Sequence, residues 1–147
     1  MATLPDDPQL NAWVALQPDD VTGDPLWKLD AYRHAAFLVT LARGDAARAA
    51  GHPVCRDVAP QLLRAVTSVA ANVAEGYGRP TVPDRLRFLS FAAGSVREAH
   101  MWYEAAEPAL SVVIVRDRCA RLARTRRILL GLLSRLRANA GKRVEQW

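Results

Sequence analysis

Cysteine and long apolar runs are scarce in this 147-residue chain. Its two cysteines, Cys55 and Cys119, lie far apart and have no second Cys or His at the spacing of metal ligands. This spacing argues against a disulfide framework and against a zinc site. The longest apolar runs are about five residues, whereas a membrane span needs roughly 18 or more. We therefore expect two reduced, packed thiols, no metal, no cofactor and no membrane segment.

Residues that favour strands are also thin, and they never alternate with polar residues over the length of a strand. Ala and Leu, with 26 and 18 copies, dominate instead, and both are strong helix formers. The composition predicts an all-α fold, and the length suits one domain. The first 20 residues contain four Asp, no basic cluster and no apolar signal core, so a cytoplasmic protein is expected.

Proline and glycine divide the chain into four Pro-poor segments with apolar residues at helical spacing. We expect helices over about residues 25–43, 57–75, 83–107 and 113–140. The first should bury Leu29, Tyr32, Ala36 and Val39 and end at Gly44, the second should stop at Gly76, and the third should bury His100. Thr81 and Asp84 suggest an N-terminal capping box for the third. Short connections favour an up-down antiparallel four-helix bundle over residues 24–141, after an acidic, flexible arm at 1–23 and before a tail at 142–147.

A specific motif lies between Gln61 and Glu98. It consists of N-V-A-E-G-x-G-R, ending at Arg79, and R-F-L-x-x-A-x-G-S-x-x-E, beginning at Arg87. This stretch resembles the four-helix-bundle proteins encoded in 23S rRNA intervening sequences, a family that includes the accessory variability determinants of diversity-generating retroelements. The resemblance spans about residues 26–107. It implies a ring-like homopentamer, and in the retroelement branch it implies binding to a reverse transcriptase and to nucleic acid.

The motif residues form a polar stripe beside the apolar seam of the second helix and a second stripe roughly opposite the seam of the third, so the third helix has two faces that need partners. We expect these stripes to form a subunit interface with a polar network, and a purely intrachain network is the alternative. No His or nucleophile stands at a recognisable spacing from the acids, so we expect no catalytic site. The interface or network residues are Arg64, Ser68, Asn72, Glu75, Arg79, Arg87, Phe91, Gly94, Ser95, Glu98 and Trp102.

Charge is polarised along the chain. Residues 1–30 carry six Asp against one Lys, whereas residues 116–143 carry ten basic side chains against one Asp. The acidic arm could cover the basic helix in cis. Arg126 falls on the apolar side of that helix, where it should pair with an acid such as Glu75 or Glu98 or face a channel. The arginines that share an outward arc of about 140°, and so can neutralise several phosphates, are Arg116, Arg121, Arg124, Arg127 and Arg135.

Two functions follow from these patterns. The first is a non-enzymatic oligomeric adaptor that binds RNA or DNA through the last helix; the family resemblance implies that it would do so as an accessory subunit of a retroelement reverse transcriptase. The second is a structural protein–protein interaction module, as in the rRNA intervening-sequence branch, with a solvated basic face. A small enzyme would need a catalytic constellation that the sequence does not contain.

Overall fold

The computed structural model describes residues 7–140, and that part of the chain contains helices and no strand. The predicted all-α fold is therefore confirmed. The expected tail at 142–147 lies outside the described residues. The elements are α1 (Pro8–Ala15), α2 (Asp19–Thr22), the 3₁₀ helix η1 (Pro25–Lys28), α3 (Asp30–Ala50), α4 (Val58–Tyr77), α5 (Val82–Ala105), α6 (Glu107–Leu110) and α7 (Val112–Asn139).

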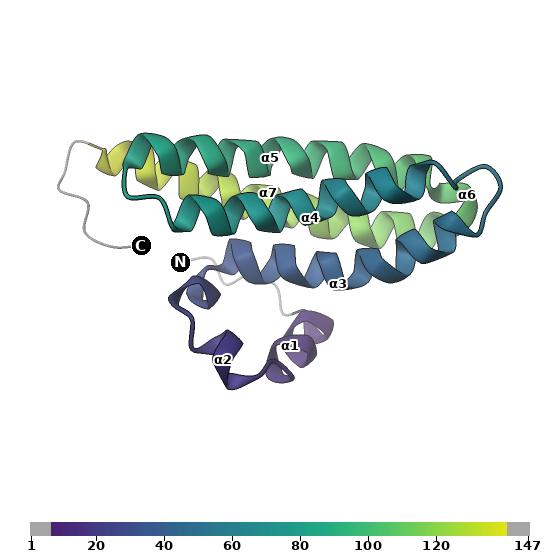
Figure 1. Cartoon of the computed structure of the whole chain (residues 1–147), viewed down its shortest axis with the longest axis horizontal. Helices are drawn as coiled ribbons and strands as arrows, with labels where there is room; N and C mark the ends of the chain where they lie inside the picture. Colours follow the sequence, from purple (N-terminus) through teal and green to yellow (C-terminus); the bar gives the residue numbers. More distant parts are fainter. Residues whose placement is uncertain (1–6, 141–147) are drawn as a thin grey trace.

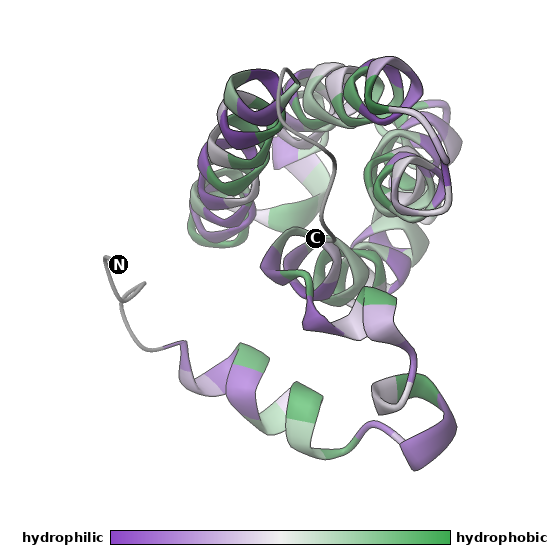
Figure 2. Ribbon diagram, turned by 90° about the vertical axis from the view of Figure 1, so that its left-hand side faces the viewer, coloured by the Kyte–Doolittle hydropathy of each residue, from purple (hydrophilic) through white to green (hydrophobic). Residues whose placement is uncertain are grey.

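The four long helices α3, α4, α5 and α7 lie side by side around a common interior (Figures 1 and 2). Followed along the chain by colour, each runs in the direction opposite to the one before it (Figure 1). Each long helix contacts two others, and α3 and α7 close the arrangement. The interior is filled by aliphatic side chains, as the apolar seams predict. Those fully shielded from solvent include Leu62, Val66, Val69, Val73, Leu89, Leu122 and Leu129.

The helix that was expected over residues 25–43 begins and ends elsewhere. Asp24 caps only the 3₁₀ turn η1, where its carboxylate accepts a hydrogen bond from the Leu26 amide at 2.8 Å. The α-helix then starts at Asp30 and continues through Gly44 to Ala50. Gly44 was the wrong stop because the residues after it form a further buried turn, in which Ala46 and Ala49 pack against Cys55.

The buried face of α3 also differs from the expected one. The expected stripe of Leu29, Tyr32, Ala36 and Val39 lies at the edge of the core and is only partly buried. The residues turned fully inward are Ala31, Ala35, Leu38 and Ala42. Alanine was a weak signal for a core position, but small side chains let α3 approach its neighbours closely.

Residues 7–22, expected as a loose acidic arm, instead contain the helices α1 and α2, which lie beside α3 (Figures 1 and 2). Trp13 on α1 packs between Trp27 and Phe37, with ring centroids 5.6 and 5.4 Å away. Leu10 is also buried in this contact. Aromatic contacts of this kind bury large apolar areas, so they attach α1 to the outside of the bundle.

The helices α4 and α5 agree with the expected ranges to within two residues. The predicted capping box is present at α5, where Thr81 Oγ1 accepts a hydrogen bond from the Asp84 amide and donates one to the Asp84 carboxylate. Gly76 does not stop α4. It is buried at the crossing with α5, where an added Cβ would lie 3.2 Å from Phe88 Cβ.

Candidate nucleic-acid interface and polar networks

The arginines of α7 fall into a covered group and an open group. Arg121 belongs to the covered group, with a side chain only 13% exposed. Its guanidinium donates hydrogen bonds to Asp7 at 2.5 Å, to Gln9 at 2.7 Å and to Asp117 at 3.0 Å. Arg121 also lies over the Phe37 ring, 5.2 Å from its centroid. The acidic N-terminal segment therefore covers this part of the predicted nucleic-acid face.

Arg124 lies beside the same carboxylate. Its Nη1 atom is 3.6 Å from Asp7 Oδ2, and its side chain is 21% exposed. Burial acts against the charged form of Asp7, but the hydrogen bond from the Leu10 amide and the charges of Arg121 and Arg124 outweigh it. Together they hold the pKa of Asp7 below its usual value. The carboxylate is therefore ionised at neutral pH and partly neutralises both arginines.

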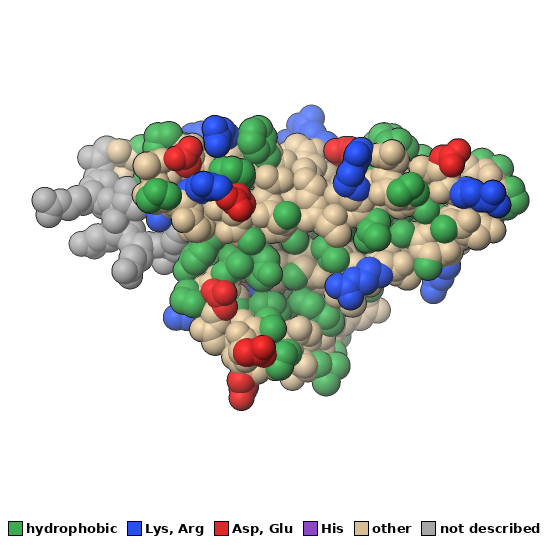
Figure 3. Space-filling view, viewed as in Figure 1, with side chains coloured by type: hydrophobic (Ala, Val, Ile, Leu, Met, Phe, Trp, Pro, Cys, Tyr) green, Lys and Arg blue, Asp and Glu red, His purple; other side chains and the backbone are tan. Residues whose placement is uncertain are grey.

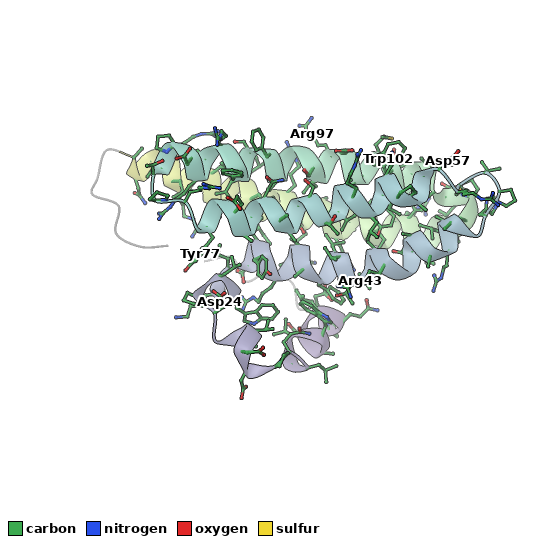
Figure 4. All side chains as sticks on the ribbon, in the orientation of Figure 1. Asp24, Arg43, Asp57, Tyr77, Arg97 and Trp102 are labelled. Atoms are coloured by element: carbon green, nitrogen blue, oxygen red, sulfur yellow. The ribbon has the colours of Figure 1, made fainter. Side chains whose placement is uncertain are left out.

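Among the five predicted arginines, the open group consists of Arg116, Arg127 and Arg135, whose side chains are exposed. None of the three has an ion pair or hydrogen-bond partner among residues 7–140. Arg97 on α5 is likewise exposed without such a described partner, and it points away from the bundle (Figure 4). Of the five predicted arginines, three thus lie free on the surface and two are held by the N-terminal segment.

Arg126 lies in a surface pocket between α5 and α7 that is also lined by Arg97, His100, Met101 and Glu104. It contacts neither Glu75 nor Glu98, and its Nε atom is buried without a hydrogen-bond partner in the described structure. His100 was wrongly placed in the core. Its side chain is 43% exposed, and its Nδ1 atom lies 3.7 Å from Glu104.

Part of the predicted polar network forms between α4 and α5. The hydroxyls of Ser68 and Ser95 are 2.9 Å apart. Asn72 donates from its amide nitrogen to the Ser68 hydroxyl at 3.0 Å and to the Ser68 carbonyl at 2.9 Å. These side chains are half-buried or buried, so the motif serine and asparagine satisfy one another within the chain.

The other predicted interface residues make local contacts along the outer faces of α4 and α5. Glu75 pairs with Arg79, and Glu98 accepts a hydrogen bond from the Trp102 indole at 3.3 Å. Arg79 and Arg87 both lie over the Phe88 ring. Arg64 donates to Gln61 at 2.5 Å. Phe91 is 53% exposed, and no atom lies within 4 Å of a Cβ built on Gly94.

These outer faces therefore carry apolar groups interspersed with charges, as the space-filling view also shows over α4 and α5 (Figure 3). Within one chain, no described element covers Phe91 or Gly94.

A buried ionic network was missed by the sequence analysis. The Asp45 side chain is 2% exposed and receives hydrogen bonds from the Tyr103 hydroxyl at 2.9 Å and from Arg118 Nε at 2.7 Å. These residues join α3, α5 and α7. Burial, followed by the Asp45 charge, raises the pKa of Tyr103 well above its usual value. Tyr103 falls within the third expected helix, but no local sequence pattern reveals its partners, because they lie 58 and 15 residues away along the chain.

Comparison with known proteins bears on the middle of the chain. Residues 55–111 match the family of 23S rRNA-intervening sequence proteins. The match covers α4, α5 and α6, including the Ser68, Asn72 and Ser95 contacts, and it supports the resemblance to the intervening-sequence family. No curated protein and no solved structure gives a significant match.

Metal-binding clusters and membrane-spanning helices are both absent from the part of the chain that the structure describes. The described residues contain no cluster of three or more His, Cys, Asp or Glu that could hold a metal ion. Within residues 7–140, no helix combines the length and the apolarity needed to cross a membrane.

Proposed function

We propose that this chain is a non-enzymatic adaptor that binds nucleic acid through the outer side of α7. The observation that carries the proposal is the set of exposed arginines on α7, Arg116, Arg127 and Arg135, that have no counter-ion among the described residues. A cation without an intramolecular partner keeps its full electrostatic attraction for an external anion. Arginine is also the side chain best suited to phosphate oxygens.

The spacing of these arginines suits a phosphate backbone. At a rise of about 1.5 Å per residue, Arg116 and Arg127 lie roughly 16 Å apart along the axis, and Arg127 and Arg135 lie roughly 12 Å apart. Each strand of a duplex places one phosphate about every 3.4 Å along its axis. The three guanidiniums can therefore contact phosphates several nucleotides apart on one strand.

The proposed binding is independent of base sequence. The helix α7 contains no Phe, Tyr or Trp, so it offers no aromatic platform on which bases could stack. Contacts from arginine to phosphate position a nucleic acid without reading its sequence. We therefore expect RNA and DNA of different sequences to bind with similar, strongly salt-dependent affinity.

The non-enzymatic part of the proposal rests on how the acids of the motif are used. Glu75 is paired with Arg79, and Glu98 accepts the Trp102 hydrogen bond. Neither carboxylate is placed beside a nucleophile or a histidine among these contacts. A general base needs such a partner within hydrogen-bond reach of the proton that it removes.

The proposal extends to how copies of this chain assemble and to the protein that they accompany. We infer an up-down four-helix bundle that forms a ring-like homo-oligomer, a pentamer by the family resemblance. In the retroelement form of this role it accompanies a reverse transcriptase in the cytoplasm. Support comes from the intervening-sequence match and from the uncovered Phe91. In a ring, the α7 arginines of several copies would act together on one nucleic acid.

Charge reversal of the open arginines tests the binding surface. The variant Arg116→Glu, Arg127→Glu, Arg135→Glu should bind a fluorescent single-stranded RNA and a duplex DNA at least tenfold more weakly in anisotropy titrations at low salt. The slope of log affinity against log salt should fall in magnitude by about 2 with the single strand, because each lost phosphate contact removes roughly 0.7.

The matched control reverses Arg43, Arg48 and Arg56, which are exposed on α3 and in the connection to α4 and change the net charge equally. Arg43 lies on the α3 side of the bundle, whereas Arg97 lies on the α5 side, at the top of the view (Figure 4). The control should retain most of the affinity. Equal losses in both variants, or no binding by the wild-type chain, would refute the α7 surface.

The second candidate is a protein–protein interaction module without a nucleic-acid role. The observation that favours it is the outer face of α5, where Phe91 is 53% exposed beside the open position at Gly94. In that case the chain would bind a protein partner through this face. Such binding would be abolished by Phe91→Asp and unaffected by the reversal of Arg116, Arg127 and Arg135.

A further inference from the structure

We propose that Arg121 and Arg124 form a phosphate-binding site that the N-terminal segment, residues 7–17, occupies in cis with the carboxylate of Asp7. This inference rests on the proposed nucleic-acid function and extends it to a second, covered part of α7. When a nucleic acid binds, one of its phosphates takes the place of the Asp7 carboxylate and α1 leaves the surface.

The geometry around Asp7 is that of an occupied anion site. A single oxygen, Asp7 Oδ2, lies 2.5 Å from Arg121 Nη1 and 3.6 Å from Arg124 Nη1. Two guanidiniums that converge on one oxygen form the arrangement that also binds a phosphate oxygen. The Asp7 carboxylate therefore stands in for the ligand.

The Arg121 guanidinium is held in place independently of α1. Asp117, four residues earlier on α7, accepts a hydrogen bond from its Nε atom at 3.0 Å. The ring of Phe37 on α3 supports the guanidinium from one side at 5.2 Å. Both supports would remain if α1 moved away, so the site would not have to be built anew for an external phosphate.

The covered site continues the open row of arginines. Arg121, Arg124 and Arg127 follow one another at intervals of three residues, about 4.5 Å along the helix axis at each step. Each interval of three also turns the side chain by about 60° around the helix, from the open side of Arg127 toward α3. A strand bound at Arg127 would therefore meet Arg124 and then Arg121 next.

The attachment of α1 is small enough to be displaced. Of its eight residues only Leu10 is buried, Trp13 is partly exposed where it packs against Trp27 and Phe37, and Leu16 just after the helix is 81% exposed. A helix this short is not stable by itself in water, so its docking contacts are what order it. Segments with few buried contacts open at a low free-energy cost compared with the core.

A nucleic acid has an advantage over Asp7 in this competition. The segment offers one carboxylate to the two arginines, and Gln9 adds a neutral hydrogen bond to Arg121. A polynucleotide offers several linked phosphates, of which others already contact Arg116 and Arg127. The local concentration of phosphate at the covered site is therefore high once the open row is occupied.

The variant Asp7→Asn tests the site in the full chain. It removes the competing charge while retaining the size of the side chain. It should bind a single-stranded oligonucleotide roughly three- to tenfold more tightly than the wild type, because the competing ion pair is lost. Its salt slope should steepen by about 0.7 for each additional phosphate contacted.

The matched control is Asp19→Asn on α2, an exposed carboxylate in the same segment with no side-chain partner among residues 7–140. It changes the net charge equally and should alter the affinity less than twofold. Adding Arg124→Ala to Asp7→Asn should abolish the gain. If Asp7→Asn and Asp19→Asn behave alike while the wild type binds, the covered site is refuted and the proposed function survives.

Hydrogen exchange gives a readout that does not depend on affinity. In the wild-type chain, the amides of residues 9–17 should exchange faster when the oligonucleotide is bound, because α1 is released. Unchanged or slower exchange there would refute displacement even if binding occurs. If neither the wild type nor Asp7→Asn binds any oligonucleotide, both the covered site and the proposed function are wrong.

Discussion

Asp45 is the residue on which the buried polar structure depends most. Its carboxylate is 2% exposed and is the counter-ion of Arg118, whose own side chain is 14% exposed. Burial opposes the charged form of Arg118, but the hydrogen bonds and the charge of Asp45 outweigh it and raise the pKa of the guanidinium. Arg118 thus remains charged, and of its two ion-pair partners Asp45 is the buried one, since Asp117 is 40% exposed.

The substitution Asp45→Asn should lower the free energy of unfolding by about 3 kcal/mol. It leaves a largely buried guanidinium without its main counter-ion, and breaking a buried pair from one side costs on this scale. Urea denaturation followed by circular dichroism measures the change. The control Asp57→Asn, at an exposed carboxylate before α4 (Figure 4), should change stability by less than about 0.5 kcal/mol. Equal small effects would show that Arg118 does not need Asp45.

His34 couples stability to pH. Burial, followed by the charge of Arg124, holds the pKa of His34 below its ordinary value of 6.5, although Asp30 and Asp7 act in the opposite direction and Arg33 adds to the lowering. The unfolded chain therefore binds the proton more readily than the folded chain. Stability is fully present above about pH 6.5 and falls as the pH is lowered below it.

The measurement for His34 is the midpoint of urea unfolding at pH 7.5 and at pH 5.5. The wild type should lose stability between these values, and His34→Gln should lose less because it removes one of the groups that titrate in this range. The corresponding His52→Gln variant, outside the bundle core, should retain the wild-type slope. A His34→Gln variant with an unchanged slope would contradict this assignment.

At the scale of single elements, the crossing of α4 and α5 depends on Gly76. A Cβ at this position would lie 3.2 Å from Phe88 Cβ and 3.5 Å from the Arg85 carbonyl oxygen. Backbone and Cβ atoms cannot move aside as the end of a flexible side chain can. Gly76→Ala should therefore destabilise the chain by about 1 to 3 kcal/mol, the usual cost of overpacking a core.

Gly94→Ala is the matched control within α5. No atom lies within 4 Å of the added Cβ, and Ala is favoured over Gly inside a helix by about 1 kcal/mol. The isolated chain should therefore become more stable, opposite in sign to Gly76→Ala. Thermal unfolding of both variants under identical conditions decides the matter. A destabilised Gly94→Ala variant would point to a close neighbour that one chain does not supply.

The sequence predicted α4 and α5 well because apolar periodicity marks both helices and a capping box marks the start of α5. It predicted α3 poorly because its inward face is alanine, which is common on any helix face. The segment at 7–22 was missed since its helices are short, and they depend on contacts of Trp13 with residues 14 and 24 positions away. Pairing of Asp7 with Arg121 joins residues 114 positions apart, which no local pattern can reveal.

At the scale of the whole molecule, the acidic N-terminal residues and the basic residues of α7 are only partly separated in space. Around α2 and η1, three acids remain exposed: Asp19, Asp20 and Asp24. Asp7, in contrast, forms an ion pair with Arg121 of α7. Acidic side chains are visible on the segment that contains α2 and η1 in the space-filling view (Figure 3). Since η1 packs on α3 and α2 packs on η1, these acids add a negative region on the α3 side of the bundle, which would repel nucleic acid from that side.

Assembly into an oligomer is also a property of the whole molecule. Phe91 is 53% exposed on α5, and its ring meets the partly buried Phe88 edge to face at 6.0 Å, so an aromatic ring lies open on the surface. We expect the wild-type chain to have several times the 16.2 kDa mass of one copy by light scattering at micromolar concentration. Phe91→Asp should reduce that mass to one copy, because a charge at the centre of an apolar contact is costly to bury.

Val54→Asp provides the control for assembly, since Val54 is 74% exposed in the connection between α3 and α4 and lies away from the outer face of α5. It introduces the same charge and should leave the mass unchanged. Circular dichroism should show that both variants remain helical. A wild-type chain that scatters as a single copy would refute the oligomer. Loss of assembly in Val54→Asp alone would show that the interface lies at the connection between α3 and α4 and not on the outer face of α5.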